Sequence, residues 1–259
     1  MKTILNTANE AAAKASRLIM KHFGKLKFSQ VNKKAKNELV SFIDTTAEKI
    51  IKRVILKKYP EHDFLGEETG LSGKKGDNMW IVDPLDGTTN YVNGIPQFCV
   101  SIGFVHNSSV QVGLVYDPVK SECFTATKGG ISKLNGRRIF VSAQKALEES
   151  LIGYGTPYRL KYNRKKYYEI YGDIQKSVRD QRRMGSAALD LCYVACGRFS
   201  AFWEVGLAPW DIAAGMLMVE AAGGTVTDFR NKPCSLDMPH ILASNGIIHD
   251  KLIRKLKSF

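Results

Sequence analysis

Residues 80–90 read Trp-Ile-Val-Asp-Pro-Leu-Asp-Gly-Thr-Thr-Asn, and no other run constrains the fold of this chain as strongly. The β-branched Ile-Val pair predicts a strand. Pro84 then fixes φ and donates no hydrogen bond, while Gly87 permits a backbone conformation that other residues avoid. The run therefore predicts a strand that ends in a tight polar turn, with two carboxylates, Asp83 and Asp86, three residues apart.

The chemistry of this turn suits two kinds of ligand. Carboxylates and neighbouring backbone carbonyls are the oxygen ligands that Mg²⁺ prefers. The backbone amides of Gly87, Thr88 and Thr89 can cradle an oxyanion at the start of a helix or in a nest. A turn that merely closes a strand would also use Pro and Gly, but it would not require the whole string. We therefore predict a site where a metal ion and a phosphate group meet.

The same run resembles the D-P-x-D-G-T-x-N hallmark of the inositol monophosphatase family, a family of metal-dependent phosphatases. Upstream, residues 65–68 read Leu-Gly-Glu-Glu, like the family's G-E-E. Downstream, residues 210–215 read Trp-Asp-Ile-Ala-Ala-Gly, like its second signature W-D-x-A-A-G. Residues 116–118 and 185–191 are most similar to bacterial members. The resemblance runs from the first predicted helix to the last.

For the fold, the resemblance implies a mixed α/β chain arranged as a layered α-β-α-β-α sandwich. Apolar residues at helical spacing predict two leading helices, around 4–23 and 47–55, and Asn135-Gly136 is a strong hairpin signal within an antiparallel meander. Further helices are predicted at 165–180, 187–197, 212–222 and 247–256, and strands at 101–105, 110–116, 123–127, 150–154 and 201–205.

We expect one domain over residues 1–259. A chain of this length with 44% hydrophobic residues can bury a full core, and no linker or low-complexity tract divides it. The N-terminal subdomain, about 1–142, would carry the metal motif, and the C-terminal subdomain, about 143–259, would carry the residues that face the substrate.

The resemblance also implies a metal site. Glu67, Asp83 and the Leu85 carbonyl would hold a first Mg²⁺, and Asp83, Asp86 and Asp211 a second, with two or three ions in each active site. Without cations, four converging carboxylates would repel one another and desolvate poorly. The ions would activate a water and neutralise the phosphoryl group during in-line attack, and Glu67 counts among the catalytic residues for this reason. Two simpler interpretations stay open: Glu67 as a solvated loop acid, and Asp211 as a helix cap.

Proton handling is the next implication of the resemblance. The family pairs a Thr of the central motif with an Asp from an upstream helix to orient and deprotonate the attacking water, and the matching residues are Thr88 and Asp44. An N-cap role for Asp44 is the alternative. Lys33, eleven residues before Asp44, matches a loop lysine that draws phosphate and water toward the metals.

Recognition of the substrate hydroxyls is expected from the C-terminal half of the chain. By resemblance, Glu204 accepts hydrogen bonds from substrate hydroxyls, and a small phosphorylated polyol is the expected substrate. Ser186 as an ordinary N-cap and Glu204 as a surface acid remain alternatives. The residues expected to contact the substrate are Lys33, Asp86, Gly87, Thr88, Gly185, Ser186, Ala187 and Glu204.

Composition adds bounds on location and assembly. The chain shows no signal-peptide pattern and no apolar stretch long enough to span a bilayer, so a soluble cytoplasmic protein is expected. Five cysteines without a C-x-x-C pair suit reduced thiols. By resemblance, a homodimer and inhibition by Li⁺ are expected. Relatives that act on fructose 1,6-bisphosphate, nucleotide 3′-phosphates or histidinol phosphate share these metal residues, so the motif defines the reaction better than the substrate.

Net charge favours a second class of function. The chain carries a formal charge of +13, and residues 159–183 hold nine Lys/Arg against three Asp/Glu, with tyrosines interleaved. This composition is typical of an RNA-facing surface, although a solvated lysine-rich face is commoner. A nucleic-acid-associated or ribonucleoprotein-associated binding protein on the same fold is therefore the alternative to an enzyme.

Overall fold

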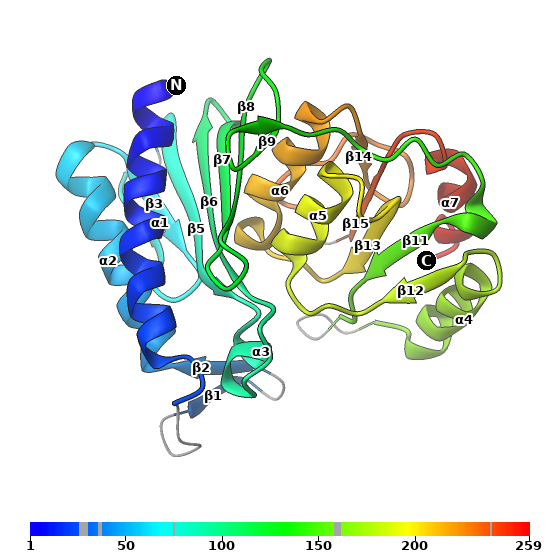
Figure 1. Ribbon diagram of the computed structural model, residues 1–259, viewed down its shortest axis with the longest axis horizontal. Coiled ribbons are helices and arrows are strands. Elements are labelled where there is room, and N and C mark those ends of the chain that lie inside the picture. The colour runs from blue at the N-terminus through cyan, green and yellow to red at the C-terminus, as the bar shows by residue number, and fades with distance from the viewer. Residues whose placement is uncertain (26–30, 36–37, 75, 158–161, 239) are drawn as a thin grey trace.

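The computed structural model describes residues 1–25, 31–35, 38–74, 76–157, 162–238 and 240–259, and the side chains of all these except 31–35 and 38–41. Five layers follow one another across the molecule (Figure 1). Helices α1 (Lys2–His22) and α2 (Phe42–Lys58) cover the outer face of an eight-stranded sheet. The next layers are α5 (Ala187–Ala195) with α6 (Pro209–Ala221), then a five-stranded sheet, then α4 (Arg164–Gln175) with α7 (His249–Leu256). The α-β-α-β-α sandwich is confirmed.

The eight-stranded sheet has the order β10-β9-β8-β7-β6-β5-β3-β4. From β5 to β10 every neighbouring pair is antiparallel, which confirms the predicted meander. Positive φ at Asn135 (49°) and Gly136 (79°) makes the two-residue hairpin turn between its last strands. The strand bounds are β3 Asp63–Gly66, β4 Gly70–Ser72, β5 Asn78–Asp86, β6 Cys99–His106, β7 Ser109–Asp117, β8 Glu122–Thr127, β9 Lys133–Leu134 and β10 Arg137–Arg138.

The five-stranded sheet has the order β12-β11-β13-β15-β14 and mixes parallel with antiparallel pairs. Its strands are β11 Leu151–Tyr154, β12 Asp180–Arg182, β13 Ala201–Val205, β14 Thr225–Thr227 and β15 His240–Ser244. The prediction of a helix over 165–180 was wrong at its end. Helix α4 stops at Gln175, Val178 turns into the outer core, and Asp180 begins β12, which pairs with β11.

Shorter elements complete the chain. A hairpin of β1 (Val31–Ala35) and β2 (Glu38–Ser41) precedes α2, and the single-turn helix α3 (Thr88–Val92) follows β5. A short 3₁₀ turn covers Leu147–Glu149. All five cysteines are free thiols, and no helix in the described ranges is long and apolar enough to cross a membrane.

Strand alternation decides which side chains reach the middle layer. On β5, Trp80 and Val82 pack toward α1 and α2, whereas Ile81 packs beside Ala213 of α6. Because successive side chains of a strand point to opposite faces, Asp83 lies on the α6 side with Ile81. On β13, Trp203 faces the outer helices. The middle layer therefore receives the carboxyl group of Asp83 from β5, a strand that is otherwise largely apolar.

Candidate active site

The polar turn at the end of β5 has the predicted form. Asp83 pairs with Ser101 and Asp86 with Cys99, so β5 has one more residue than β6 between these two pairs. Such an irregularity bends a strand and re-aims its side chains. Gly87 follows with φ of 98°, and a Cβ there would lie 2.8 Å from the Gln97 carbonyl oxygen. Only glycine fits both the conformation and the space.

Asp83 is the electrostatic centre of the site. Its side chain is buried, and its Oδ1 accepts a hydrogen bond from the Leu85 N–H at 2.9 Å. Burial raises the pKa of Asp83 well above its ordinary value, and the charges of Glu67, Asp86 and Asp211 raise it further. The structure thus brings Glu67, Asp86 and Asp211 within electrostatic range of Asp83.

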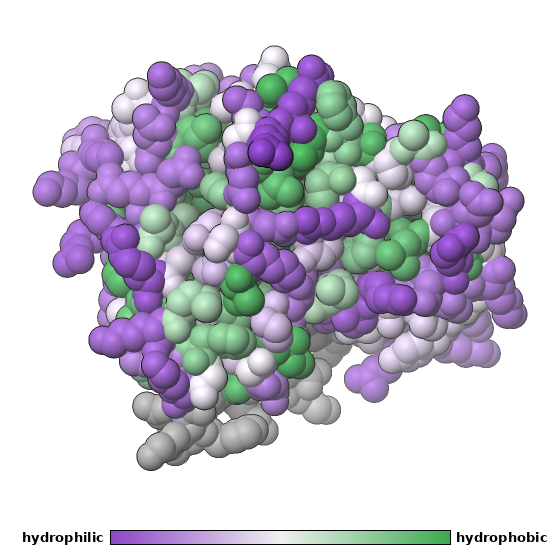
Figure 2. Space-filling model, viewed as in Figure 1, coloured by the Kyte–Doolittle hydropathy of each residue, from purple (hydrophilic) through white to green (hydrophobic). Residues whose placement is uncertain are grey.

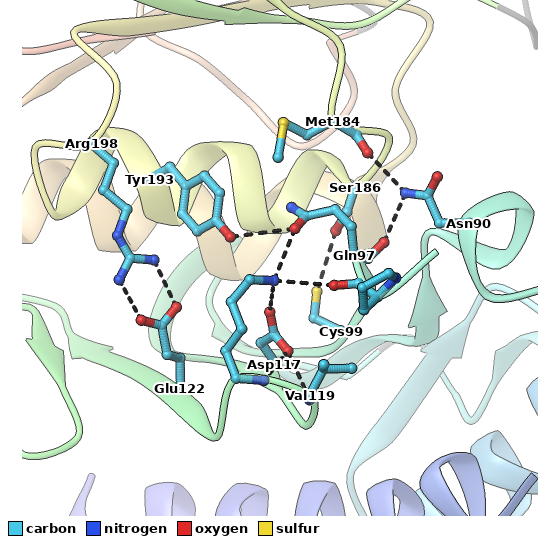
Figure 3. Close-up of polar contacts among 12 residues, drawn as sticks. Asn90, Gln97, Cys99, Asp117, Val119, Glu122, Met184, Ser186, Tyr193 and Arg198 are labelled. Carbon is cyan, nitrogen blue, oxygen red and sulfur yellow. Dashed lines mark hydrogen bonds and ion pairs between the residues drawn. The ribbon is translucent and has the colours of Figure 1, made fainter. Parts of the chain in front are cut away.

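Asp86 is bound to the beginning of α5. Its Oδ2 accepts hydrogen bonds from the Ser186 hydroxyl at 2.7 Å and from the Ala188 N–H at 2.8 Å. Ser186 occupies the N-cap position of α5, but its side chain makes no capping bond, so the ordinary N-cap role is wrong. The Cys99 thiol also approaches the Ser186 oxygen, at 3.6 Å (Figure 3). The hydroxyl therefore orients Asp86 rather than the helix.

Asp211 is the third residue of α6, a helix that begins at Pro209. Its Oδ2 accepts the N–H of Ala208 at 2.7 Å, which satisfies one donor at the start of the helix. Its charge nevertheless raises the pKa of Asp83. The capping interpretation and the proximity to the other acids are therefore both correct.

Glu67 lies in the three-residue turn between β3 and β4. Its backbone N–H donates to the Val82 carbonyl at 3.1 Å, which fixes the turn against β5. The side chain is half-buried, and of the three neighbouring acids Glu67 raises the pKa of Asp83 the most. A freely solvated loop acid is inconsistent with this position.

Thr88 and Asp44 meet as the resemblance implied. The Thr88 Oγ1 lies 2.8 Å from Asp44 Oδ1 and 3.0 Å from the Leu85 carbonyl oxygen, and its single proton can serve one of the two acceptors at a time. Asp44 is the third residue of α2 and is buried, so its interpretation as an N-cap was wrong. Lys33 lies in β1, and its side chain falls outside the described part of the structure.

Glu204 is buried on β13, which excludes its interpretation as a surface acid. Its carboxyl group lies over Gly155, where an added Cβ would come within 1.8 Å of the Glu204 Cδ. Sequence reasoning missed its neighbour Asp190, which is 1% exposed on α5. Burial raises the pKa of Asp190, Glu204 raises it further, and Arg183 lowers it. A single acid in the apolar run of α5 was the signal that could have revealed it.

Asn90 is a second residue whose role the sequence did not reveal. Its Nδ2 donates to the carbonyl oxygens of Gln97 and Met184, each at 2.8 Å (Figure 3). Gly185 follows Met184 with φ of 89°, and a Cβ there would lie 2.8 Å from the same nitrogen. Asn90 therefore joins the β5 turn to the loop that leads into Ser186 and Ala187.

The chemistry of the donor set, rather than the spacing of its side chains, suits a hard divalent cation. Among the residues described, no group of three or more His, Cys, Asp or Glu side chains has the close arrangement of a metal site. Asp83, Asp86 and Asp211 instead each accept at least one backbone N–H. Their oxygen-only, mutually repelling carboxylates nonetheless have the chemistry that Mg²⁺ selects.

Comparison with known proteins covers the whole chain. Residues 1–259 match the inositol monophosphatase family model. The chain is 42% identical over 250 residues to Nus factor SuhB of Pseudomonas aeruginosa, covering 95% of this chain and 92% of that protein. It is 42% identical over 243 residues to an inositol-1-monophosphatase of Rhizobium meliloti, covering 93% and 91%. The crystal structure of extragenic suppressor protein suhB from Bartonella henselae superposes with a TM-score of 0.94 at 40% identity, covering 98% of both chains.

Proposed function

Because this chain belongs to the inositol monophosphatase family, we propose that it is a Mg²⁺-dependent phosphomonoesterase that hydrolyses inositol monophosphate or a related small polyol phosphate. The observation that carries the proposal is the convergence of three acids, Glu67, Asp86 and Asp211, on the buried carboxyl group of Asp83. That carboxyl group is buried, and Glu67, Asp86 and Asp211 each disfavour its charged form. A bound divalent cation would reverse this penalty, because it favours the charged form of every carboxylate near it.

The metal ions would be held by Glu67, Asp83, the Leu85 carbonyl, Asp86 and Asp211. When bound, such ions activate water and neutralise charge on a phosphoryl group. Two or three ions per site is the number that the resemblance implies. The contacts of Asp83, Asp86 and Asp211 with backbone N–H groups hold each carboxylate in a defined orientation before an ion arrives.

The Thr88–Asp44 pair would handle the proton of the attacking water. Thr88 can accept a hydrogen bond from that water while it donates to Asp44, and the buried Asp44 carboxylate can take up the proton. The backbone amides of Gly87 and Thr88 lie at the start of α3, where they can contact a phosphate oxygen. The resemblance implies that Lys33 adds positive charge near the phosphate.

The polyol would lie toward the second sheet. Glu204 would offer carboxylate oxygens to substrate hydroxyls. The loop of Gly185, Ser186 and Ala187 is linked to the metal ligands by the Ser186–Asp86 hydrogen bond. Asn90 supports this loop from the β5 turn. Binding of hydroxyls in such a site depends on a few polar groups that fix orientation.

A panel of phosphate esters tests the proposal directly. Purified protein with Mg²⁺ should release phosphate from inositol 1-phosphate faster than from fructose 1,6-bisphosphate, a nucleotide 3′-phosphate or histidinol phosphate. A chelator should stop the reaction, and added Mg²⁺ should restore it. Preference for another ester would change the substrate but keep the reaction, whereas no release from any ester would contradict the proposal.

We propose the cytoplasm as the location and a homodimer as the assembly, and light scattering at the mass of a monomer would contradict the latter.

A second function, binding within a nucleic-acid-associated assembly, is favoured by relatives named Nus factor SuhB. Hydrophilic residues are frequent at the end of the molecule that carries α4 and α7 (Figure 2). Lys165, Arg179 and Arg182 are exposed there.

The tyrosines of this stretch weaken the RNA interpretation. Tyr167 is fully buried and packs on Trp203 with ring centroids 5.3 Å apart, and Tyr171 belongs to the same core. Tyr168, at 59% exposure, is available to stack on a base. Arg182 forms an ion pair with Asp180. The interleaved aromatic pattern therefore serves the core more than the surface, and the phosphatase remains the favoured function.

A further inference from the structure

Glu48 is a fully buried carboxylate that no step of the proposed reaction uses. It lies on α2, one helical turn after Asp44, and its side chain is 0% exposed. A charged group in such a place destabilises the fold unless hydrogen bonds compensate for the lost water. Its contacts therefore indicate what it is retained for.

Both oxygens of Glu48 bind the turn that presents Glu67. Oε2 accepts the backbone N–H of Glu68 at 2.8 Å, and Oε1 accepts that of Thr69 at 2.9 Å. The carboxylate lies directly over Gly66, where an added Cβ would come within 2.3 Å of Oε2. The glycine before the acidic pair is thus required by the close approach of Glu48.

We propose that Glu48 is a positioning residue that sets the place of Glu67 in the metal site. The inference rests on the proposed metal-dependent function. The Glu67 N–H is held by Val82 of β5 on one side of the turn, and the next two N–H groups are held by Glu48 on the other. The turn is thereby fixed at both ends, so Glu67 meets the β5 carboxylates without having to be ordered by the ion. Outer contacts of this kind raise metal affinity by about 10- to 100-fold in other sites.

The same helix also holds the other half of the site. Asp44 and Glu48 are four residues apart and therefore share one face of α2. Asp44 accepts from Thr88 after β5, while Glu48 accepts from the turn after β3. One helical turn of α2 therefore fixes the spacing between the two chain segments that carry Glu67 and the proton-handling threonine.

Asp63 provides a matched control at the other end of β3. It is buried, it accepts the N–H groups of Lys74 and Gly76, and it lies against Gly73 as Glu48 lies against Gly66. It thus binds the N–H groups of Lys74 and Gly76 by the same type of contact, at the opposite end of β3 from Glu67. Asp63→Asn and Glu48→Gln each remove one charge and weaken one pair of hydrogen bonds to backbone N–H groups.

The experiment compares Mg²⁺ affinity, measured by isothermal titration calorimetry, in the wild type, Glu48→Gln, Gly66→Ala and Asp63→Asn. Circular dichroism and melting temperatures establish that each variant is folded at the temperature used. Gly66→Ala keeps every charge but displaces the Glu48 carboxylate, so it separates position from charge. We expect Glu48→Gln to weaken Mg²⁺ binding by about tenfold or more and Gly66→Ala to weaken it in the same direction, while Asp63→Asn changes it by less than about twofold.

Amide hydrogen exchange gives a second measurement that does not depend on metal. In folded Glu48→Gln, the N–H groups of Glu68 and Thr69 should exchange faster, with Lys74 and Gly76 unchanged. Unchanged Mg²⁺ affinity in a folded Glu48→Gln, or equal weakening of Mg²⁺ binding in Asp63→Asn, would overturn the role of Glu48 but leave the proposed function standing. A wild-type protein that binds no Mg²⁺ would overturn the proposed function and, with it, this inference.

Discussion

The Asp44 carboxylate accepts a hydrogen bond from the Thr88 hydroxyl at 2.8 Å, although the two residues are 44 positions apart in the chain. This contact joins the first turn of α2 to the residue that follows the polar turn of β5. Both members are held: Asp44 is buried, and Thr88 also lies against the Leu85 carbonyl. A hydroxyl fixed between a carboxylate and a carbonyl is well placed to orient a water molecule.

Thr88→Ala should lower kcat by about 10²- to 10⁴-fold, because the attacking water loses both its orientation and its path to Asp44. Thr46→Ala is the matched control, since Thr46 lies on the same helix and its hydroxyl donates to the Phe42 carbonyl. It should keep the wild-type rate of phosphate release. If Thr88→Ala retains wild-type kcat, the pair has no part in proton transfer.

Asp190→Asn should stabilise the protein increasingly as pH rises above about 4, near the pKa of an unfolded aspartate. Burial and Glu204 raise the pKa of Asp190 in the fold, so the folded state keeps its proton to higher pH than the unfolded state. Stability of the wild type is therefore lost as pH rises through the folded value, and asparagine removes that loss. Melting temperatures across this pH range test the sign.

Asp180→Asn is the control for that series. The Asp180 side chain is 44% exposed, and its contact with Arg182 lowers its pKa, so its contribution to stability is present above the unfolded pKa and lost at lower pH. This variant should show no gain in stability as pH rises. A melting-temperature difference for Asp190→Asn that is flat or falls with pH would show that the acid is not held in its protonated form.

Millimolar Li⁺ should inhibit turnover uncompetitively with respect to substrate, as the family resemblance implies. The second metal position, which Asp83, Asp86 and Asp211 would form, is the expected place of binding. Initial rates at several substrate concentrations with and without Li⁺ measure the effect. Unchanged turnover at saturating substrate would require different roles for Asp86 and Asp211.

Substitutions that remove positive charge test whether the basic surface near α4 binds nucleic acid. Replacing Lys165, Lys166, Arg179 and Arg182 with Gln removes four charges near α4, and the matched control removes four from α1 and α2 through Lys14, Lys21, Lys49 and Lys57. If charge acts only as a diffuse field, KM for a small phosphate ester rises modestly in both, RNA binding stays weak, and added salt removes the difference. Micromolar RNA binding at physiological salt that only the α4 variant loses would instead establish a nucleic-acid site.

The local features of the site could be predicted because they depend on neighbouring residues. Asp83, Pro84 and Gly87 predict a strand, a turn and a left-handed glycine without knowledge of the rest of the chain. The helix that follows Ser186 and the helix that contains Asp211 can also be predicted from local patterns. In each case the determining interactions are separated by only a few residues.

Other parts depend on distant partners and could not be predicted. Strands β12 and β14 have three residues each, too few for a periodic signal, and they form because β11 and β15 offer edges to pair with. The Ser186–Asp86 bond spans 100 residues. The tyrosines interleaved with basic residues in 159–183 are typical of an exposed surface, but the helical period turns Tyr167 toward Trp203. Burial of such residues is decided by packing between layers.

The central claim is that Asp83 and its neighbouring acids hold the catalytic metal. Asp83→Asn removes one charge from the centre of the cluster and should abolish Mg²⁺-dependent phosphate release. In the presence of a chelator the same change should raise the melting temperature. Asparagine removes the cost of burying a charged carboxylate and the repulsion between that charge and the neighbouring acids, which together raise the pKa of Asp83. If Asp83→Asn instead destabilised the fold, both the activity and the melting temperature would fall. The two measurements therefore distinguish loss of a metal ligand from loss of folding.

The most direct measurement is kcat of Asp83→Asn with saturating Mg²⁺ and inositol 1-phosphate, taken alongside its melting temperature in chelator. We expect no measurable turnover and a melting temperature above that of the wild type. A variant that keeps more than about a tenth of the wild-type kcat, which is a barrier increase below about 1.4 kcal/mol, would contradict the assignment of Asp83 as the shared metal ligand.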